Sequence, residues 1–222
     1  MKFENFQIDP EFNQEIKDTY ESFYNEIWHE HEYDRFGVTI SPGDTVVDFG
    51  GSIGLFAQYA VHNGAEKVYT FEFQDKIYEY MRKNVENEPK IVATHGFIGP
   101  AFFNSHDYQD YPTFSPDIEI WTIEKVMETF QLETIDFLKV DIEGGEFDLI
   151  DATPVEILSR VKKISMEVHV WQMFEYVGDP GIAAYNAQKF LNMMEKLNLC
   201  GFKVSIQKIH RHTCLYMLYA SR

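Results

Sequence analysis

A glycine-rich turn between two apolar segments constrains the fold of this chain more than any other feature. Residues 46–56 read Val-Val-Asp-Phe-Gly-Gly-Ser-Ile-Gly-Leu-Phe, and Val-Tyr-Thr-Phe-Glu follows at 68–72. The first apolar run predicts a buried strand, the glycines predict a tight turn, and residues from about 53 to 63 predict a helix. The second run predicts a parallel strand that ends in an acid. Together these segments form one βαβ unit of the nucleotide-binding type.

The spacing of the glycines separates two classes of ligand. A dinucleotide fingerprint requires Gly-x-Gly-x-x-Gly, but aligned on Gly50 this chain has Ser52 and Leu55 at the other glycine positions. The carboxylate of Asp48 at the strand end would repel a pyrophosphate bound at the helix N-terminus. It suits a ligand with an amino group, and S-adenosylmethionine carries an α-amino group and a sulfonium but no phosphate. The turn therefore favours S-adenosylmethionine over NAD.

Size and composition indicate one α/β domain in a reducing compartment. The chain has 222 residues, of which 45% are hydrophobic, enough for one well-buried domain and too few for two of ordinary size. Its formal net charge of −17 opposes binding to nucleic acid or to an anionic membrane surface. No apolar run approaches the roughly 20 residues of a membrane span, and the N-terminus lacks signal-peptide features. With only two cysteines, Cys200 and Cys214, we expect buried free thiols and a cytoplasmic location.

Alternating strand and helix patterns predict a doubly wound, mostly parallel, Rossmann-like sheet of seven strands with a C-terminal antiparallel hairpin. Beyond the first two strands, at about 45–49 and 67–72, the expected strands of this sheet are 90–98, 135–141, 162–169, 202–207 and 214–220, and a further short strand is expected at 118–121. The expected helices are 74–87, 122–131, 181–197 and one that begins at Thr153-Pro154-Val155-Glu156, with Thr153 as its N-cap. We expect residues 1–35 to form an N-terminal helical extension and residues 36–222 to form the domain.

Ligands of such sheets bind beyond the carboxyl ends of the strands, so the residues that end each strand form the candidate site. We expect Glu72 to accept hydrogen bonds from both ribose hydroxyls. We expect Phe97 and Ile98, at the end of the third strand, to enclose the adenine. The full set of predicted cofactor contacts is Asp48, Gly50, Gly51, Ser52, Gly54, Glu72, Phe73, Phe97, Ile98 and Asp141.

The next two strands bring acids and a histidine to the same edge of the sheet. One ends in Asp141, and the other ends in Glu167-Val168-His169. Glu167 and His169 are two residues apart, so their side chains point to the same face of the sheet. The candidate catalytic residues are Asp141, His169 and Glu143. Glu146 fits the first turn of the following helix, where the helix dipole stabilises a carboxylate. Aromatic residues after this strand are expected partly in the core and partly as a wall for the acceptor; they are Trp171, Phe174, Tyr176 and Tyr185.

Taken together, these segments resemble the FkbM family of S-adenosylmethionine-dependent methyltransferases. The matching pieces are residues 43–54, 68–72, 135–146 and 164–169, and the resemblance covers about residues 36–170. The chain departs from the family pattern at Gly51-Ser52, where Ala-Asn is usual, and at Phe73-Gln74, where Pro-x is usual. The resemblance implies a class I methyltransferase fold and transfer of a methyl group to a hydroxyl of a sugar or polyketide-like acceptor.

Such a transfer is an in-line displacement at the sulfonium methyl, and the attacking hydroxyl must also lose its proton. Two versions remain open. In one, His169 or Asp141 takes the proton directly. In the other, Asp141, Glu167 and His169 hold Mg²⁺ or Mn²⁺, which acidifies the hydroxyl, by analogy with metal-dependent O-methyltransferases of this fold.

The expected function is therefore S-adenosylmethionine-dependent O-methylation of a sugar or glycan, without a nucleic-acid partner. One alternative is a methyltransferase with a small-molecule acceptor, polyketide-like or carboxylate. The other is a non-catalytic nucleoside-binding α/β protein, against which the acids at the strand ends argue.

Overall fold

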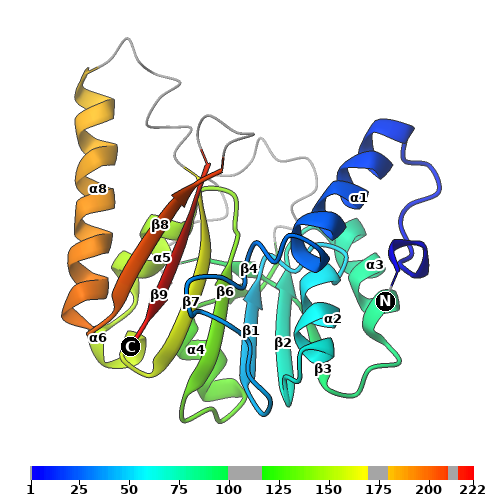
Figure 1. The fold of residues 1–222 in the computed structure, drawn as a ribbon, viewed down its shortest axis with the longest axis horizontal. Coiled ribbons are helices and arrows are strands. Elements are labelled where there is room, and N and C mark those ends of the chain that lie inside the picture. The colour runs from blue at the N-terminus through cyan, green and yellow to red at the C-terminus, as the bar shows by residue number, and fades with distance from the viewer. Residues whose placement is uncertain (1, 100–116, 170–179, 210–214) are drawn as a thin grey trace.

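The structure, a computed structural model, describes residues 2–99, 117–169, 180–209 and 215–222, with side chains of the last helix described from residue 187 onward. A seven-stranded sheet with the order β3-β2-β1-β6-β7-β9-β8 forms its centre (Figure 1). The strands from β3 to β7 in this order are parallel, whereas β9 is antiparallel to both β7 and β8. The seven strands are β1 (Thr45–Phe49), β2 (Lys67–Glu72), β3 (Ile91–His95), β6 (Ile135–Val140), β7 (Val161–His169), β8 (Lys203–Lys208) and β9 (Leu215–Ser221).

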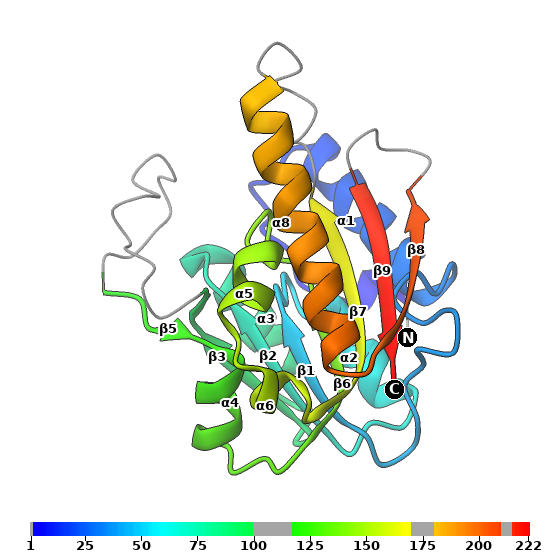
Figure 2. The ribbon, with the colours of Figure 1, turned by 90° about the vertical axis from the view of Figure 1, so that its left-hand side faces the viewer.

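Helices cover both faces of this sheet. On one face lie α1 (Gln14–Trp28), α2 (Leu55–His62) and α3 (Asp75–Val85), and on the other lie α4 (Ile123–Thr129), α5 (Glu146–Ala152), α6 (Val155–Leu158) and α8 (Pro180–Leu199). A short 3-10 helix, Phe3–Asn5, precedes α1. Figure 2 views the molecule from the side of α8. The predicted doubly wound sheet with a C-terminal hairpin is confirmed.

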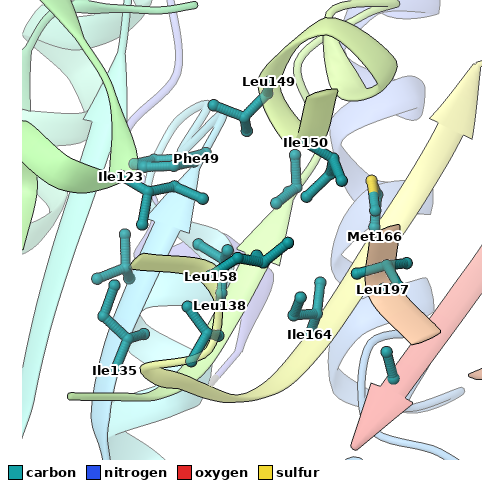
Figure 3. Packing of buried hydrophobic residues seen from close by; sticks show 14 of the residues in the cluster. Phe49, Ile123, Ile135, Leu138, Leu149, Ile150, Leu158, Ile164, Met166 and Leu197 are labelled. Atoms are coloured by element: carbon teal, nitrogen blue, oxygen red, sulfur yellow. The ribbon is translucent and has the colours of Figure 1, made fainter. Parts of the chain in front are cut away.

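The sheet has two cores because successive residues of a strand point to opposite faces. In β1, Val46 packs into the cluster with α1 and α2, while Val47 packs into the cluster with α4, α5 and α8. In β6, Phe137 and Leu138 divide in the same way. Figure 3 shows the second cluster, in which Leu138 lies among side chains from β7 and the covering helices. Residues buried on both faces explain why these central strands read as continuous apolar runs.

Strand order reverses at β1, which pairs with β2 on one side and β6 on the other. In open α/β sheets, ligands bind at such a reversal, beyond the carboxyl ends of the strands. The ends of β1 and β6 carry the glycine turn and Asp141, respectively. The topology therefore assembles the predicted site residues at one edge.

Two sequence predictions are wrong in detail. The strand expected at 90–98 ends at His95, because the amide of Phe97 donates to the carbonyl of Glu119 and pairs β4 (Phe97–Ile98) with β5 (Ile120–Trp121) in a separate two-stranded sheet. Thr153 is not an N-cap: its hydroxyl donates to the Leu149 carbonyl at 2.7 Å, so it ends α5, and Pro154 precedes α6.

Within the described residues, none of the helices combines the length and the apolar character that crossing a membrane requires.

The glycine turn generates a test of packing against backbone strain. Gly50 (φ +81°) and Gly43 (φ +91°) both have left-handed backbones, but a β-carbon on Gly50 would lie 1.7 Å from the Asp141 carbonyl oxygen, whereas one on Gly43 would meet nothing within 4 Å. We expect Gly43→Ala to lower the free energy of unfolding by roughly 1–2 kcal/mol, the cost of a left-handed residue. Gly50→Ala adds a backbone clash and should cost far more. Urea unfolding of both variants checks this, and equal losses would contradict it.

Candidate active site

The turn after β1 joins the backbones of three strands. The amides of Gly50 and Gly51 both donate to the Phe71 carbonyl, at 3.1 and 2.7 Å, and the amide of Asp141 donates to the Phe49 carbonyl at 3.0 Å. A β-carbon on Gly51 would lie 2.2 Å from Thr70 Oγ1. Packing alone therefore requires both glycines, whatever ligand the turn binds.

Asp48 lies beneath this turn with no exposed surface. Its Oδ2 accepts a hydrogen bond from Thr70 at 2.7 Å, and its Oδ1 lies 3.3 Å from Nζ of Lys139. The same ammonium donates to the Gly50 carbonyl at 2.6 Å and lies 3.5 Å from Oδ2 of Asp141. Lys139 thus links the cofactor turn to the end of β6.

Glu72 is fixed at the end of β2 by backbone donors. The amide of Ser52 donates to Oε2 at 3.0 Å, and those of Phe73 and Gln74 donate to Oε1 at 2.9 and 2.8 Å. A carboxylate accepts about four hydrogen bonds, so these three leave room for a ligand hydroxyl. Burial raises the pKa of Glu72 to about 7, although the backbone donors stabilise the charged form.

Phe97, one of the two predicted adenine contacts, lies beside Phe73, another predicted cofactor contact. The rings of Phe73 and Phe97 approach with their centroids 5.8 Å apart, nearly perpendicular to each other. Ile98 instead packs into the core beside α4, with 6% of its surface exposed.

Asp141, Glu167 and His169 converge at the carboxyl ends of β6 and β7. Each offers one ligand atom, and these three atoms lie within 4.8 Å of one another. Nε2 of His169 is 4.0 Å from Asp141 Oδ1 and 3.7 Å from Glu167 Oε1. Among the described residues, the cluster is a set that could hold a metal ion.

The imidazole of His169 is held from behind by Glu146. Nδ1 of His169 lies 3.0 Å from Oε1 of Glu146, which is fully buried and also accepts from the amides of Ile142 and Gly144. Glu146 does begin a helix, α5, but it also orients the histidine. Glu143 lies on the other side, with its Oε2 3.5 Å from Nε2 and a largely exposed side chain.

Charges within the cluster shift two pKa values. Burial and the neighbouring Asp141 raise the pKa of Glu167 to about 8. Burial alone would lower the pKa of His169, but the hydrogen bond and charge of Glu146, with Asp141 and Glu143, raise it to about 9. The ligand-free cluster therefore retains protons near neutral pH, and a bound cation would displace them.

Sequence reasoning missed two members of this site. Tyr33, between α1 and β1, donates through its hydroxyl toward Asp141 Oδ2 at 3.0 Å and Glu167 Oε2 at 3.1 Å. Nothing in the sequence around Tyr33 signals this contact. Lys139 did carry a signal, since a lysine inside the run Phe137-Leu138-Lys139-Val140 is a charge in an otherwise apolar buried strand.

Some predictions fall outside the described residues. Trp171, Phe174, Tyr176 and Cys214 are among them, and the side chain of Tyr185 is not described either. The predicted aromatic wall for the acceptor therefore stays a prediction. Cys200 is a buried free cysteine, as expected.

Glu72 gives a pH test. Its pKa rises from 4.5, the ordinary value of a glutamate in an unfolded chain, to about 7 in the folded protein. The folded state therefore binds this proton more tightly than the unfolded state does. Stability of the ligand-free protein should therefore fall by up to roughly 3 kcal/mol from this group as the pH rises from about 4.5 to about 7. We expect Glu72→Gln to flatten the pH dependence of urea unfolding relative to wild type. The exposed Glu79→Gln on α3 should leave it unchanged; identical profiles for all three proteins would contradict the assignment.

Comparison with known proteins shows the family of this chain. The profile of the methyltransferase FkbM domain matches residues 48–204. The AMB antimetabolite synthetase AmbE of Pseudomonas aeruginosa is 23% identical over 256 residues, which cover 91% of this chain but 12% of that protein. The chain thus spans only a small part of this curated relative.

Solved methyltransferases have the same fold. An O-methyltransferase from Bacillus cereus in complex with SAH (S-adenosylhomocysteine) matches 97% of this chain and 83% of its own, with a TM-score of 0.53 and 12% identity. Precorrin-6y C5,15-methyltransferase from Geobacter metallireducens matches 100% of this chain over 97% of its own length, with a TM-score of 0.50 and 12% identity. The fibrillarin pre-rRNA processing protein of Methanococcus jannaschii matches 82% of this chain over 67% of its own length, with a TM-score of 0.51 and 14% identity. At such low identities, these structures show the fold alone, which is the class I methyltransferase fold. The match of the FkbM domain over residues 48–204 shows the family: the chain belongs to the FkbM methyltransferases.

Proposed function

We propose that this chain is an S-adenosylmethionine-dependent O-methyltransferase that acts on a hydroxyl of a sugar or glycan. The observation that carries the proposal is the cluster of Asp141, Glu167 and His169 beside the glycine turn of β1. An alkyl hydroxyl must lose its proton as it attacks the methyl group, and therefore requires a base or a metal at this place. Two carboxylates and an imidazole can act as the base or can hold the metal.

The cofactor is proposed to lie across the ends of β1 and β2. Glu72 has acceptor capacity for a ribose hydroxyl, and the turn of Gly50, Gly51, Ser52 and Gly54 borders the methionine part. Phe73 and Phe97 are proposed to contact the adenine. We assign Asp48 to the cofactor through the turn that it supports with Lys139, since its own carboxylate is fully buried.

The chemistry of the donor set fits a divalent cation. Carboxylate oxygens with one imidazole suit Mg²⁺ or Mn²⁺, and a histidine whose other nitrogen is held by a carboxylate is the usual arrangement in metal sites. When bound, such a cation would lower the pKa of the acceptor hydroxyl. His169 is directed by Glu146, and Asp141 is directed by Lys139 and Tyr33.

A neutral, hydroxyl-rich acceptor matches the charge of the site. The acids at the strand ends and the net charge of −17 disfavour nucleic acid and other anionic acceptors. A small-molecule acceptor is the second candidate, favoured by the likeness to AmbE, which is named an antimetabolite synthetase. Release of SAH from S-adenosylmethionine, measured with deoxysugars, polyketide-like alcohols, carboxylates and RNA as acceptors, distinguishes these classes. Turnover with RNA alone would overturn the proposal.

Two isosteric variants should separate the cofactor subsite from the cation subsite. We expect Glu72→Gln to weaken SAH binding at least tenfold while the affinity for Mn²⁺ stays within about threefold, since Glu72 contacts the glycine turn and not the acid cluster. Glu167→Gln should do the reverse, weakening Mn²⁺ binding by about 10–100-fold. Isothermal titration calorimetry of both ligands measures this, with NAD⁺ as a ligand that should not bind.

The exposed Glu156→Gln on α6 is the matched control and should behave as wild type. The separation of the two subsites would be refuted if Glu72→Gln and Glu167→Gln each lost affinity for both SAH and Mn²⁺. It would also be refuted if wild-type protein bound NAD⁺ in preference to SAH.

A further inference from the structure

We propose that Tyr33, which precedes the residues that match the family, is a positioning residue of the active site. Its hydroxyl holds one oxygen of Asp141 and one oxygen of Glu167, so that the other oxygen of each carboxylate faces His169. The inference rests on the proposed cation site and extends it to the segment between α1 and β1.

The two carboxylates divide their oxygens between two sides. The outer oxygens, Oδ2 of Asp141 and Oε2 of Glu167, lie 3.0 and 3.1 Å from the Tyr33 hydroxyl. The inner oxygens, Oδ1 and Oε1, lie 4.0 and 3.7 Å from Nε2 of His169. Because a carboxylate is planar, fixing its outer oxygen also fixes the direction of its inner oxygen.

One phenol hydrogen cannot serve both carboxylates at once. When both carboxylates are ionised, Tyr33 donates to Asp141 or to Glu167, and the other contact then brings two oxygens together without a hydrogen between them. Lys139, 3.5 Å from Oδ2 of Asp141, offsets part of that repulsion, and positive charge on the inner side of the carboxylates relieves it further. The arrangement therefore favours a cation among the inner oxygens and Nε2 of His169, opposite the tyrosine.

Tyr33 is held rigidly enough for this role. It is buried, with 6% of its surface exposed, and its ring packs edge-on against Phe56 of α2 at 5.5 Å between centroids. The ammonium of Lys139 lies 5.3 Å from the ring centroid, on a cation–π contact. The backbone beside it is tied down as well, because the hydroxyl of Tyr219 in β9 donates to the Glu32 carbonyl at 2.5 Å.

Tyr33→Phe removes only the hydroxyl and keeps the ring contacts. We expect its affinity for Mn²⁺, measured by isothermal titration calorimetry, to fall about 10–100-fold, the usual effect of losing a group that orients metal ligands. Its affinity for SAH should stay within about threefold of wild type, because Tyr33 contacts the acid cluster and not Glu72. A merely structural role would lower both affinities together.

Tyr59→Phe is the matched control. Tyr59 is also buried, and its hydroxyl also donates to a carboxylate, that of Asp34, at 3.1 Å. It contacts Nδ1 of His31 at 2.8 Å as well, and neither Asp34 nor His31 belongs to the acid cluster. We expect this variant to bind Mn²⁺ as wild type does. Melting temperatures of both variants, with and without Mn²⁺, check that each is folded and report cation binding independently of calorimetry.

The outcomes separate this inference from the proposed function. If wild type binds Mn²⁺ and Tyr33→Phe binds it equally or more tightly, the role of Tyr33 is overturned and the cation site stands. If wild type binds SAH but no Mn²⁺, the cation site itself falls, and the role of Tyr33 falls with it. Weaker Mn²⁺ binding in Tyr33→Phe alone, with SAH binding preserved, is the result that supports the inference.

Discussion

The site depends on one buried ammonium group. Lys139, with 3% of its side chain exposed, projects from the centre of the sheet between the carboxylates of Asp48 and Asp141 and donates to the Gly50 carbonyl. Burial alone would lower the pKa of Lys139, but these carboxylates raise it above its ordinary value, so the group stays charged. Removing one partner of such a buried pair typically costs about 3–5 kcal/mol, because the other charge is left uncompensated. The cofactor turn and the end of β6 are thereby coupled into one unit.

The rest of the site extends outward from this pair. Asp141 connects Lys139 to Tyr33, and Tyr33 connects Asp141 to Glu167, so side chains from three segments far apart in sequence meet at one edge of the sheet. His169 closes the cluster, oriented by Glu146 at the start of α5. Because strand order reverses at β1, the topology brings these groups next to the glycine turn. Because they are neighbours, we propose that the cofactor contacts and the acid cluster are two halves of one reaction site.

The sequence predicted the sheet well, and also which residues meet at its carboxyl edge, because both follow from local patterns. Apolar runs at β1, β2, β6 and β7 fix the strands, and the residues that end them are automatically neighbours in a parallel sheet. The split at Gly96 was not predictable, because it depends on hydrogen bonds between β4 and β5, which are distant in sequence. Tyr33 was missed for the same reason: its partners lie 108 and 134 residues further along the chain. Lys139 could have been recognised, since a charge inside a buried strand needs a partner.

A crystal structure of the protein with SAH and Mn²⁺ tests the central claim most directly. We expect SAH along the ends of β1 and β2, with its ribose at Glu72 and its sulfur toward Asp141. We expect an anomalous Mn²⁺ peak bound by Asp141, Glu167 and His169. A cofactor bound elsewhere, or a peak away from these three side chains in crystals that hold SAH, would contradict the account.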